Sequence, residues 1–191
     1  MRRRAHDVIT IRRARPDDAA AIGAVHVAAW RSAYPGLLPG DYLAALSPAG
    51  QAAYAHRAIP GGGVHVATVS GLDLGAADAP AEVVGFVTSG RARGQSALAD
   101  GEIETLYVLD DWRDRGLGRR LMQAAADHLA DLGCQSVFLW VLRDNPSRWF
   151  YAALGGRPAQ DGTVTVAGQP IAQTAYVWSP LEKLRNACAD R

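Results

Sequence analysis

One helix between two strands is the feature that most limits the fold. Residues 117–132 carry apolar side chains on one helical face: Leu117, Leu121, Ala125, Leu129 and Leu132. The stripe stops at Gly133, a residue type that often follows the last helical turn. "EIETLYVL" (102–109) before it has the composition of a strand, and "SVFLWVL" (136–142) after it is a continuous apolar run typical of a strand covered on both faces. Strands joined through a helix pair in parallel by a right-handed crossover, so this unit predicts an α/β fold.

The other segments complete a mixed sheet. In chain order they are a strand at 8–14, a helix at 16–34, a broken helical connection at 35–57, strands at 64–70 and 82–90, a helix from Asn145–Pro146 and a hairpin over 163–178. We predict a single α/β domain over residues 1–191, with a mostly antiparallel sheet and helices on both faces. Its core covers about residues 8–180, after a short basic extension, and the loop 71–81 and the tail after Leu184 are expected to be mobile.

The composition excludes several classes of protein. The net charge of the 191 residues is +1 and no apolar run approaches bilayer length, so neither nucleic acid nor a membrane is an expected partner. The basic start lacks the apolar stretch of a signal peptide, which predicts a cytoplasmic protein. Cys134 and Cys188 lie far apart and the five histidines are scattered, so we expect no disulfide framework and no metal.

A basic, glycine-containing helix start stands out in this nearly neutral chain. "WRDRGLGRRLM" (112–122) holds four arginines: Arg113, Arg115, Arg119 and Arg120. A helix after such a turn presents free N–H groups and the positive end of its dipole, which together bind phosphate oxygens. Gly116 and Gly118 have no Cβ, so an anion can approach the backbone. The alternative is an ordinary turn with solvated arginines, and a DNA-binding role is disfavoured because the arginines gather at one helix end.

Three segments resemble the GNAT superfamily of N-acetyltransferases. "LYVLDDWRDRGLGRRLM" (106–122) is similar to its acetyl-CoA-binding motif (Q/R)xxGx(G/A), here Arg113, Gly116 and Gly118. "NPSRWFYAALGGRP" (145–158) resembles a downstream family segment, and "AAWRSAYPGLLP" (28–39) resembles the connection between the first two helices of small-amine acetyltransferases. The resemblance implies an enzyme that moves an acetyl group from acetyl-CoA to a primary amine by direct attack in a ternary complex.

The resemblance also assigns residues to acetyl-CoA. Backbone amides of six residues would hold its pyrophosphate: Asp114, Arg115, Gly116, Leu117, Gly118 and Arg119. The pantetheine arm would pair like an extra strand with Leu106, Tyr107 and Val108, where two strands splay apart. Asn145 would hydrogen-bond that arm, and Arg148, which stands where a small residue is usual, would reach a cofactor phosphate.

Tyr151 matches the tyrosine that the family uses as general acid for the departing thiolate. The ordinary pKa of about 10 of its side chain is close to that of an alkyl thiol. The spacing predicts a buried helical stripe of Phe150, Ala153 and Leu154, which leaves Tyr151 off the stripe. The alternative interpretation is a core aromatic residue.

Two carboxylates are candidates for the base that takes the proton of the amine. Glu102 and Glu104 share one face of their strand with Leu106 and Val108 if side chains alternate regularly, and a bulge would shift that parity. Spacing back from Arg113 ranks Glu102 slightly first. The alternative is that each is solvated or paired with an arginine.

The acceptor amine is expected near the end of the first predicted helix. Trp30 and Tyr34 there could hold an alkyl-ammonium group by cation–π contact, or they could be core residues. The few charges at 30–60 favour a modestly polar or partly apolar acceptor, either a small molecule or a peptide. A non-catalytic acyl-CoA sensor on the same fold is the alternative function, but it would not need Tyr151 or a carboxylate. Superfamily members often pair, so the resemblance leaves a monomer and a homodimer both open.

Overall fold

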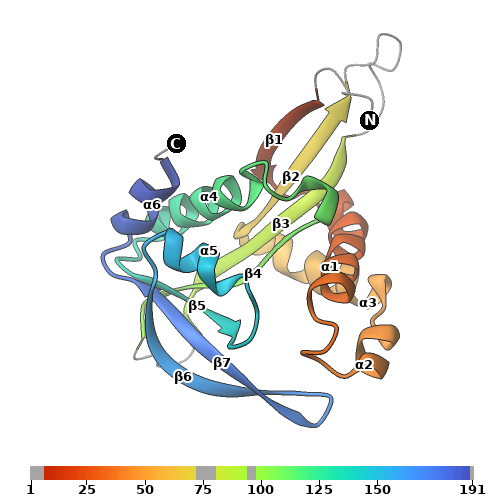
Figure 1. The fold of residues 1–191 in the computed structure, drawn as a ribbon. Helices are drawn as coiled ribbons and strands as arrows, with labels where there is room; N and C mark the ends of the chain where they lie inside the picture. The colour runs from red at the N-terminus through yellow and green to blue at the C-terminus, as the bar shows by residue number, and fades with distance from the viewer. Residues whose placement is uncertain (1–6, 72–80, 94–97, 190–191) are drawn as a thin grey trace.

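The computed structural model describes residues 7–71, 81–93 and 98–189. The basic extension at 1–6 and nearly all of the loop predicted to be mobile lie outside these residues. In chain order (Figure 1) the helices and strands are β1 (Asp7–Arg13), α1 (Ala19–Ala33), α2 (Gly40–Ala45), α3 (Pro48–Ala58), β2 (Val64–Gly71), β3 (Glu82–Arg91), β4 (Gly101–Val108), α4 (Leu117–Asp131), β5 (Val137–Leu142), α5 (Arg148–Ala153), β6 (Arg157–Val166), β7 (Gln169–Trp178) and α6 (Glu182–Ala189).

The described strands form one seven-stranded sheet in the order β1-β2-β3-β4-β5-β7-β6. Every neighbouring pair is antiparallel except β4 and β5, which are parallel and joined through α4. The predicted fold class is therefore confirmed. The final hairpin turns at Ala167 and Gly168, both with positive φ, as a tight two-residue hairpin requires.

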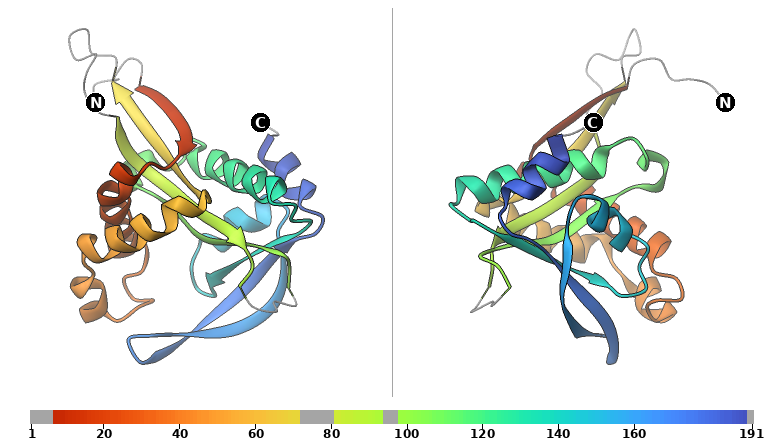
Figure 2. Two further views of the ribbon diagram at one scale, coloured as in Figure 1. Left: turned by 180° about the vertical axis from the view of Figure 1, so that it is seen from behind. Right: turned by 60° about the vertical axis from the view of Figure 1, so that its left-hand side comes forward.

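Helices cover both faces of the sheet (Figure 2). The apolar stripe of α4 is fully buried against one face, where Leu121, Ala125 and Leu129 have no exposed surface. On the other face α1 buries Ile22 and Val25 in a second cluster, together with Phe86 of β3. Gly133 has φ +78° just after α4, which confirms its predicted place at the helix end.

The parallel strands β4 and β5 separate soon after they meet. Their pairing consists of Gly101 with Val137 and Glu102 with Phe138. Beyond these pairs β4 continues beside β3 while β5 continues beside β7, and the two ribbons diverge (Figure 1). The edge of β4 that faces β5 therefore has no strand partner over its second half, as the family resemblance implies.

A β-bulge in β4 corrects one prediction about side-chain direction. The register with β3 shifts by one residue, and Glu104 is the extra residue. Leu106 and Val108 pack toward α4, whereas Glu104 reaches Tyr54 of α3 on the opposite face. The prediction that Glu102 and Glu104 share a face with Leu106 and Val108 is wrong, because the bulge reverses the alternation between them.

The helix α5 begins later than the sequence predicts. Asn145 and Pro146 precede it rather than start it, and the helix runs from Arg148. The Oδ1 atom of Asn145 accepts a hydrogen bond from the backbone N–H of Ser147 at 2.9 Å. Asn145 therefore stabilises a turn before the helix, a common alternative use of an asparagine side chain.

The buried face of α5 differs from the predicted stripe. Tyr151 and Leu154 are buried in the main core cluster, Phe150 is half-buried and Ala153 is exposed. The predicted stripe of Phe150, Ala153 and Leu154 is therefore wrong at Ala153, and Tyr151 is not off the buried face, because the packing of α5 against α4 and the sheet decides which face is covered.

The chain after Leu184, predicted to be a mobile tail, is part of a helix up to Ala189. Residues 182–189 form α6, which packs against α4. Leu181 and Leu184 have no exposed surface, and Cys188 is buried beside them. Their spacing of three and four residues is that of a helical face, which the sequence analysis passed over.

Candidate functional site

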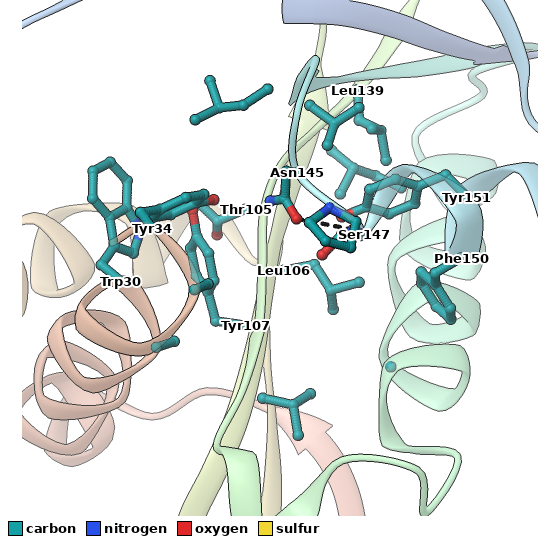
Figure 3. Close-up of a pocket in the computed structure, with 18 of the residues that line it drawn as sticks. Trp30, Tyr34, Thr105, Leu106, Tyr107, Leu139, Asn145, Ser147, Phe150 and Tyr151 are labelled. Carbon is teal, nitrogen blue, oxygen red and sulfur yellow. Dashed lines mark hydrogen bonds between the residues drawn. The ribbon is translucent and has the colours of Figure 1, made fainter. Parts of the chain in front are cut away.

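A cavity of about 900 Å³ occupies the gap between β4 and β5. This volume is typical of a small-molecule site. The cavity runs from the N-terminus of α4 to the β6–β7 hairpin, and Figure 3 shows side chains from α1, β4 and α5 converging on it. We call the two parts of the cavity the α4 end and the hairpin end, after the elements that line them. The α4 end is lined by residues including Leu106, Val108, 112–114, 116–119, 145–147, Phe150 and Tyr151, and the hairpin end by Trp30, Tyr34, Glu104, Thr105, Tyr107, Trp140, Val164, Val166 and Gln173.

The backbone at the α4 end is shaped to receive an anion. Asp114 and Gly116 have φ of 59° and 75°, in the left-handed region. The N-cap residue of α4 is Gly116, which has no side chain to cap the first turn, and the helix begins at Leu117 on the cavity wall. The N–H groups of an uncapped first turn carry the positive end of the helix dipole. The α4 end therefore offers phosphate oxygens a backbone cradle.

The two glycines of the motif have different roles. A Cβ on Gly116 would meet no atom within 4 Å, so this glycine is needed for its positive φ. A Cβ on Gly118 would lie 3.3 Å from Cζ of Phe150. Gly118 thus lets α5 pack closely against the start of α4.

The predicted cofactor arginines are not all gathered at the cavity. Arg113 and Arg119 line it, and Arg113 forms an ion pair of 2.7 Å with Asp110. Arg115 stacks over the ring of Trp112 at 4.5 Å and is not part of the lining. Arg148 also lies off the lining, where it donates to the carbonyl of Arg143 at 2.7 Å.

The unpaired edge of β4 and Asn145 lie on opposite walls of the cavity. Leu106, Tyr107 and Val108 all line it, in the stretch without a strand partner. Asn145 is buried, and its side chain interacts by hydrogen bonding with the Tyr34 hydroxyl as well as with Ser147. Figure 3 shows Asn145 between Tyr34 and Tyr151. The structure therefore brings these predicted cofactor residues together.

Tyr151 lines the cavity from α5 although most of its surface is buried. Its ring contacts the rings of Phe150, Tyr176 and Trp178. Burial raises the pKa of its hydroxyl well above the ordinary value, and the nearby Tyr34 raises it further. Among the described residues none forms a hydrogen bond with this hydroxyl. Tyr151 is thus a protonated phenol held by its ring.

The two candidate carboxylates are placed differently. Glu104 lines the cavity, where it accepts a hydrogen bond from the Tyr54 hydroxyl at 2.9 Å and pairs with Arg93 at 2.8 Å. Glu102 is half-buried and not part of the lining. Burial raises the pKa of Glu102, and the charge of Glu104 adds to that increase. Glu104 therefore forms the ion pair with an arginine that was the alternative interpretation. It also lines the cavity.

Both predicted acceptor residues, Trp30 and Tyr34, lie on the hairpin end of the cavity. The Tyr34 hydroxyl bonds inward, to the side chains of Tyr107 and Asn145, and burial raises its pKa. The indole N–H of Trp30 is buried without a well-formed hydrogen bond, so its cavity surface is apolar. Tyr34 thus combines both interpretations, since it is a core residue that also lines the site.

Five lining residues at the hairpin end were not predicted: Thr105, Trp140, Val164, Val166 and Gln173. Val164 and Val166 alternate with exposed threonines, a pattern that indicates one covered strand face. The sequence could not show what covers that face, because this depends on how the hairpin curves over α1.

Residues 47–155 match the acetyltransferase (GNAT) family. An uncharacterised N-acetyltransferase, YuaI of Bacillus subtilis (strain 168), is 30% identical over 94% of this chain and 98% of its own. The chain belongs to the GNAT family. Its enzymes are acetyltransferases that use acetyl-CoA as donor.

Solved structures share this fold. A GCN5-related N-acetyltransferase from Rhodopseudomonas palustris has a TM-score of 0.67 at 25% identity, covering 92% of this chain and 99% of its own. YncA of Salmonella typhimurium, solved with its cofactor acetyl-CoA, has a TM-score of 0.62 at 21% identity, covering 90% of this chain and 93% of its own.

In the described part of the GNAT chain, no helix combines the length and apolar character needed to cross a membrane. Nor do three or more His, Cys, Asp or Glu side chains of that part gather at a point where they could hold a metal ion.

Proposed function

We propose that this GNAT enzyme transfers the acetyl group of acetyl-CoA to a primary amine by direct attack, with both substrates in one cavity. One observation carries the proposal: the cavity joins an uncapped helix N-terminus to a buried tyrosine hydroxyl and a carboxylate. A phosphate site and a proton-transfer site are thus connected by an unpaired strand edge. The acceptor is an amine of a small molecule or peptide.

The residues at the α4 end fit acetyl-CoA. The first turn of α4, with Gly116 at positive φ, would hold the pyrophosphate through backbone N–H groups. The free edge of β4 at Leu106–Val108 offers N–H and C=O groups to the amides of the pantetheine arm, as a neighbouring strand would. Asn145 interacts with Tyr34 and Ser147 and lines the cavity, so its amide group is held where it would hydrogen-bond that arm.

Acetyl-CoA supplies the thioester, and two side chains manage the protons. A bond forms between the amine nitrogen and the acetyl carbon while the bond from that carbon to sulfur breaks. Tyr151 holds a proton at its hydroxyl for the departing sulfur, and its raised pKa keeps this proton in place throughout the neutral range. Glu104 takes the proton of the amine, directly or through water. Of the two candidate carboxylates, only Glu104 lines the cavity, which favours it over Glu102.

The arginines outside the lining have a weaker link to this function. Arg115 and Arg148 stack on tryptophans next to the α4 end, and we propose that they attract the phosphates from there rather than contact the pantetheine. A cytoplasmic location stays a prediction. Cys134 and Cys188 are free and buried, which suits a reducing compartment.

The direct test is an amine-dependent release of thiol from acetyl-CoA, with the acetylated amine identified by its mass. We expect release only when chain, acetyl-CoA and a suitable amine are all present. Binding of CoA, measured by calorimetry, without transfer to any amine would support the sensor alternative instead. Absence of CoA binding would contradict the assignment of the α4 end.

A further inference from the structure

We infer that the acceptor is a compact monoamine with an apolar body and without a carboxylate or phosphate group, such as an arylalkylamine. This inference rests on the proposed function and deepens it. It follows from the charges, shape and polarity of the hairpin end of the cavity.

Charge is distributed unequally along the cavity. Among the described residues that line it, the charged ones are Glu104, Arg113, Asp114 and Arg119. All but Glu104 belong to the start of α4. Among the described lining residues, the hairpin end therefore has Glu104 as its one charged side chain, and Arg93, which pairs with Glu104, lies outside the lining. A carboxylate on the acceptor would meet the charge of Glu104 and no cation of the lining, which is costly.

The β6–β7 hairpin turns an apolar face toward the cavity. Val164, Val166 and Gln173 line it, and Ile171, which pairs with Val164, packs against the same cluster from α1 and α2. The carboxylate of Asp161 lies on the other face of β6, where it accepts a hydrogen bond from Thr174. The hairpin thus directs its charge away from the acceptor.

The opposite wall is aromatic and has its polar groups turned inward. The ring of Trp30 contacts those of Tyr34 and Tyr107 edge to face, and His26 contacts Trp30 and Tyr107 at tilted angles. The hydroxyls of Tyr34 and Tyr107 interact with each other, and the indole N–H of Trp30 is buried. An acceptor therefore meets ring faces and edges, which suit an apolar or aromatic body and a single ammonium group.

The α1–α2 connection limits the length of the acceptor. Leu37 and Leu38, between these helices, belong to one apolar cluster with Val166 and Ile171 of the hairpin. This contact bridges the two walls of the hairpin end. The same 900 Å³ must also hold the pantetheine arm, so the space left suits a compact amine better than a polypeptide.

Among the described residues that line the hairpin end, Glu104 is the one carboxylate that can bind the amine, and Arg93 partly neutralises its charge. Glu104 is paired with Arg93 and accepts a hydrogen bond from Tyr54 of α3. A polyamine or aminoglycoside carries several charges, each of which would need its own partner. The hairpin end offers that partner once, which favours an acceptor with one amine.

The test compares four acceptors at saturating acetyl-CoA: 2-phenylethylamine, L-phenylalanine, spermidine and a tetrapeptide with a free N-terminus. Phenylalanine differs from phenylethylamine by its carboxylate alone. We expect kcat/KM for phenylethylamine to exceed that for each of the others by about tenfold or more. Binding is followed independently through the fluorescence of Trp30 and Trp140, which line the hairpin end.

A charge placed on the inner face of the hairpin provides the reverse test. Gln173→Arg should raise the phenylalanine to phenylethylamine ratio by about tenfold, because the guanidinium can pair with the carboxylate. Thr163→Arg adds the same charge to the exposed outer face and should leave the ratio unchanged.

The outcomes separate the inference from the proposed function. Transfer that is fastest to phenylalanine, spermidine or the tetrapeptide would overturn the inference and leave the transferase function standing. A Gln173→Arg ratio equal to that of Thr163→Arg would overturn the placement of the acceptor against the hairpin. No thiol release with any amine would overturn the transferase function, and the inference with it.

Discussion

The two ends of the cavity are assembled from the chain in opposite ways. Most of the α4 end comes from two short segments, 106–119 and 145–151, and much of its chemistry belongs to the backbone. The hairpin end takes side chains from α1, β4, β5, β6 and β7, which are far apart in sequence. Acetyl-CoA, the donor that the family shares, needs one backbone binding site, which a short local motif can encode. The acceptor is selected by side chains from separate elements, which can vary independently.

Tyr151→Phe tests the chemistry where the two ends meet and should have the largest effect. Removing the hydroxyl should lower kcat by about 100- to 1,000-fold, because the departing sulfur loses its proton donor. The fold should be unaffected, since no described residue bonds to that hydroxyl. Tyr176→Phe is the matched control, a buried tyrosine in contact with Tyr151 but outside the cavity lining. Equal rates for wild type and Tyr151→Phe would refute the proton-donor role.

Glu104→Gln tests the base on the acceptor side. We expect a loss of kcat of up to about 100-fold at neutral pH, which shrinks as rising pH deprotonates the amine in solution. The measurement is the pH–rate profile. Glu102→Gln keeps the neighbouring position but lies outside the lining, so it should retain most of the activity. A larger loss from Glu102→Gln would instead identify Glu102 as the base.

Gly116→Ala tests whether the α4 end depends on backbone shape. A Cβ at φ +75° costs about 1–2 kcal/mol, and relaxation of the turn would move the N–H groups that hold the phosphates. We expect KM for acetyl-CoA to rise by about tenfold, with KM for the amine unchanged. Gly168→Ala adds the same strain at φ +79° in the hairpin turn. An equal rise in KM for both variants would show that strain alone, and not the phosphate cradle, is responsible.

The smallest expected effect is a loss of stability in acid, caused by a histidine in contact with the aromatic wall of the hairpin end. Burial lowers the pKa of His26 from 6.5 to about 4, so the folded protein keeps its imidazole neutral. The unfolded chain takes up that proton as pH falls from 6.5 to 4, and this part of the stability is lost over that window. His65, also with a pKa of about 4, contributes in the same direction.

Thermal unfolding between pH 7.5 and 4.5 measures this effect. We expect Tm to fall with pH and His26→Phe to flatten the decrease by about 3 °C. A Tm of the variant that falls as steeply as that of the wild type would show that His26 is protonated in the folded state.

The sequence predicted the order of strands and helices well, because long apolar stripes and runs such as those at 117–132 and 136–142 have clear periods. The prediction failed where a local irregularity changes which way the side chains point. The bulge at Glu104 depends on pairing with β3, and the buried face of α5 depends on how Tyr151 and Leu154 pack in the core. Neither event leaves a mark in the local composition.

The sequence by itself determined the family and the backbone motif at the start of α4, since positive φ and helix termini are local properties of a few neighbouring residues. Tertiary structure alone decided that Glu104 reaches the cavity while Glu102 does not, and that Val164, Val166 and Gln173 line the same cavity as Trp30. Those contacts depend on strand register and on the divergence of β4 from β5, which are settled by packing across the whole sheet.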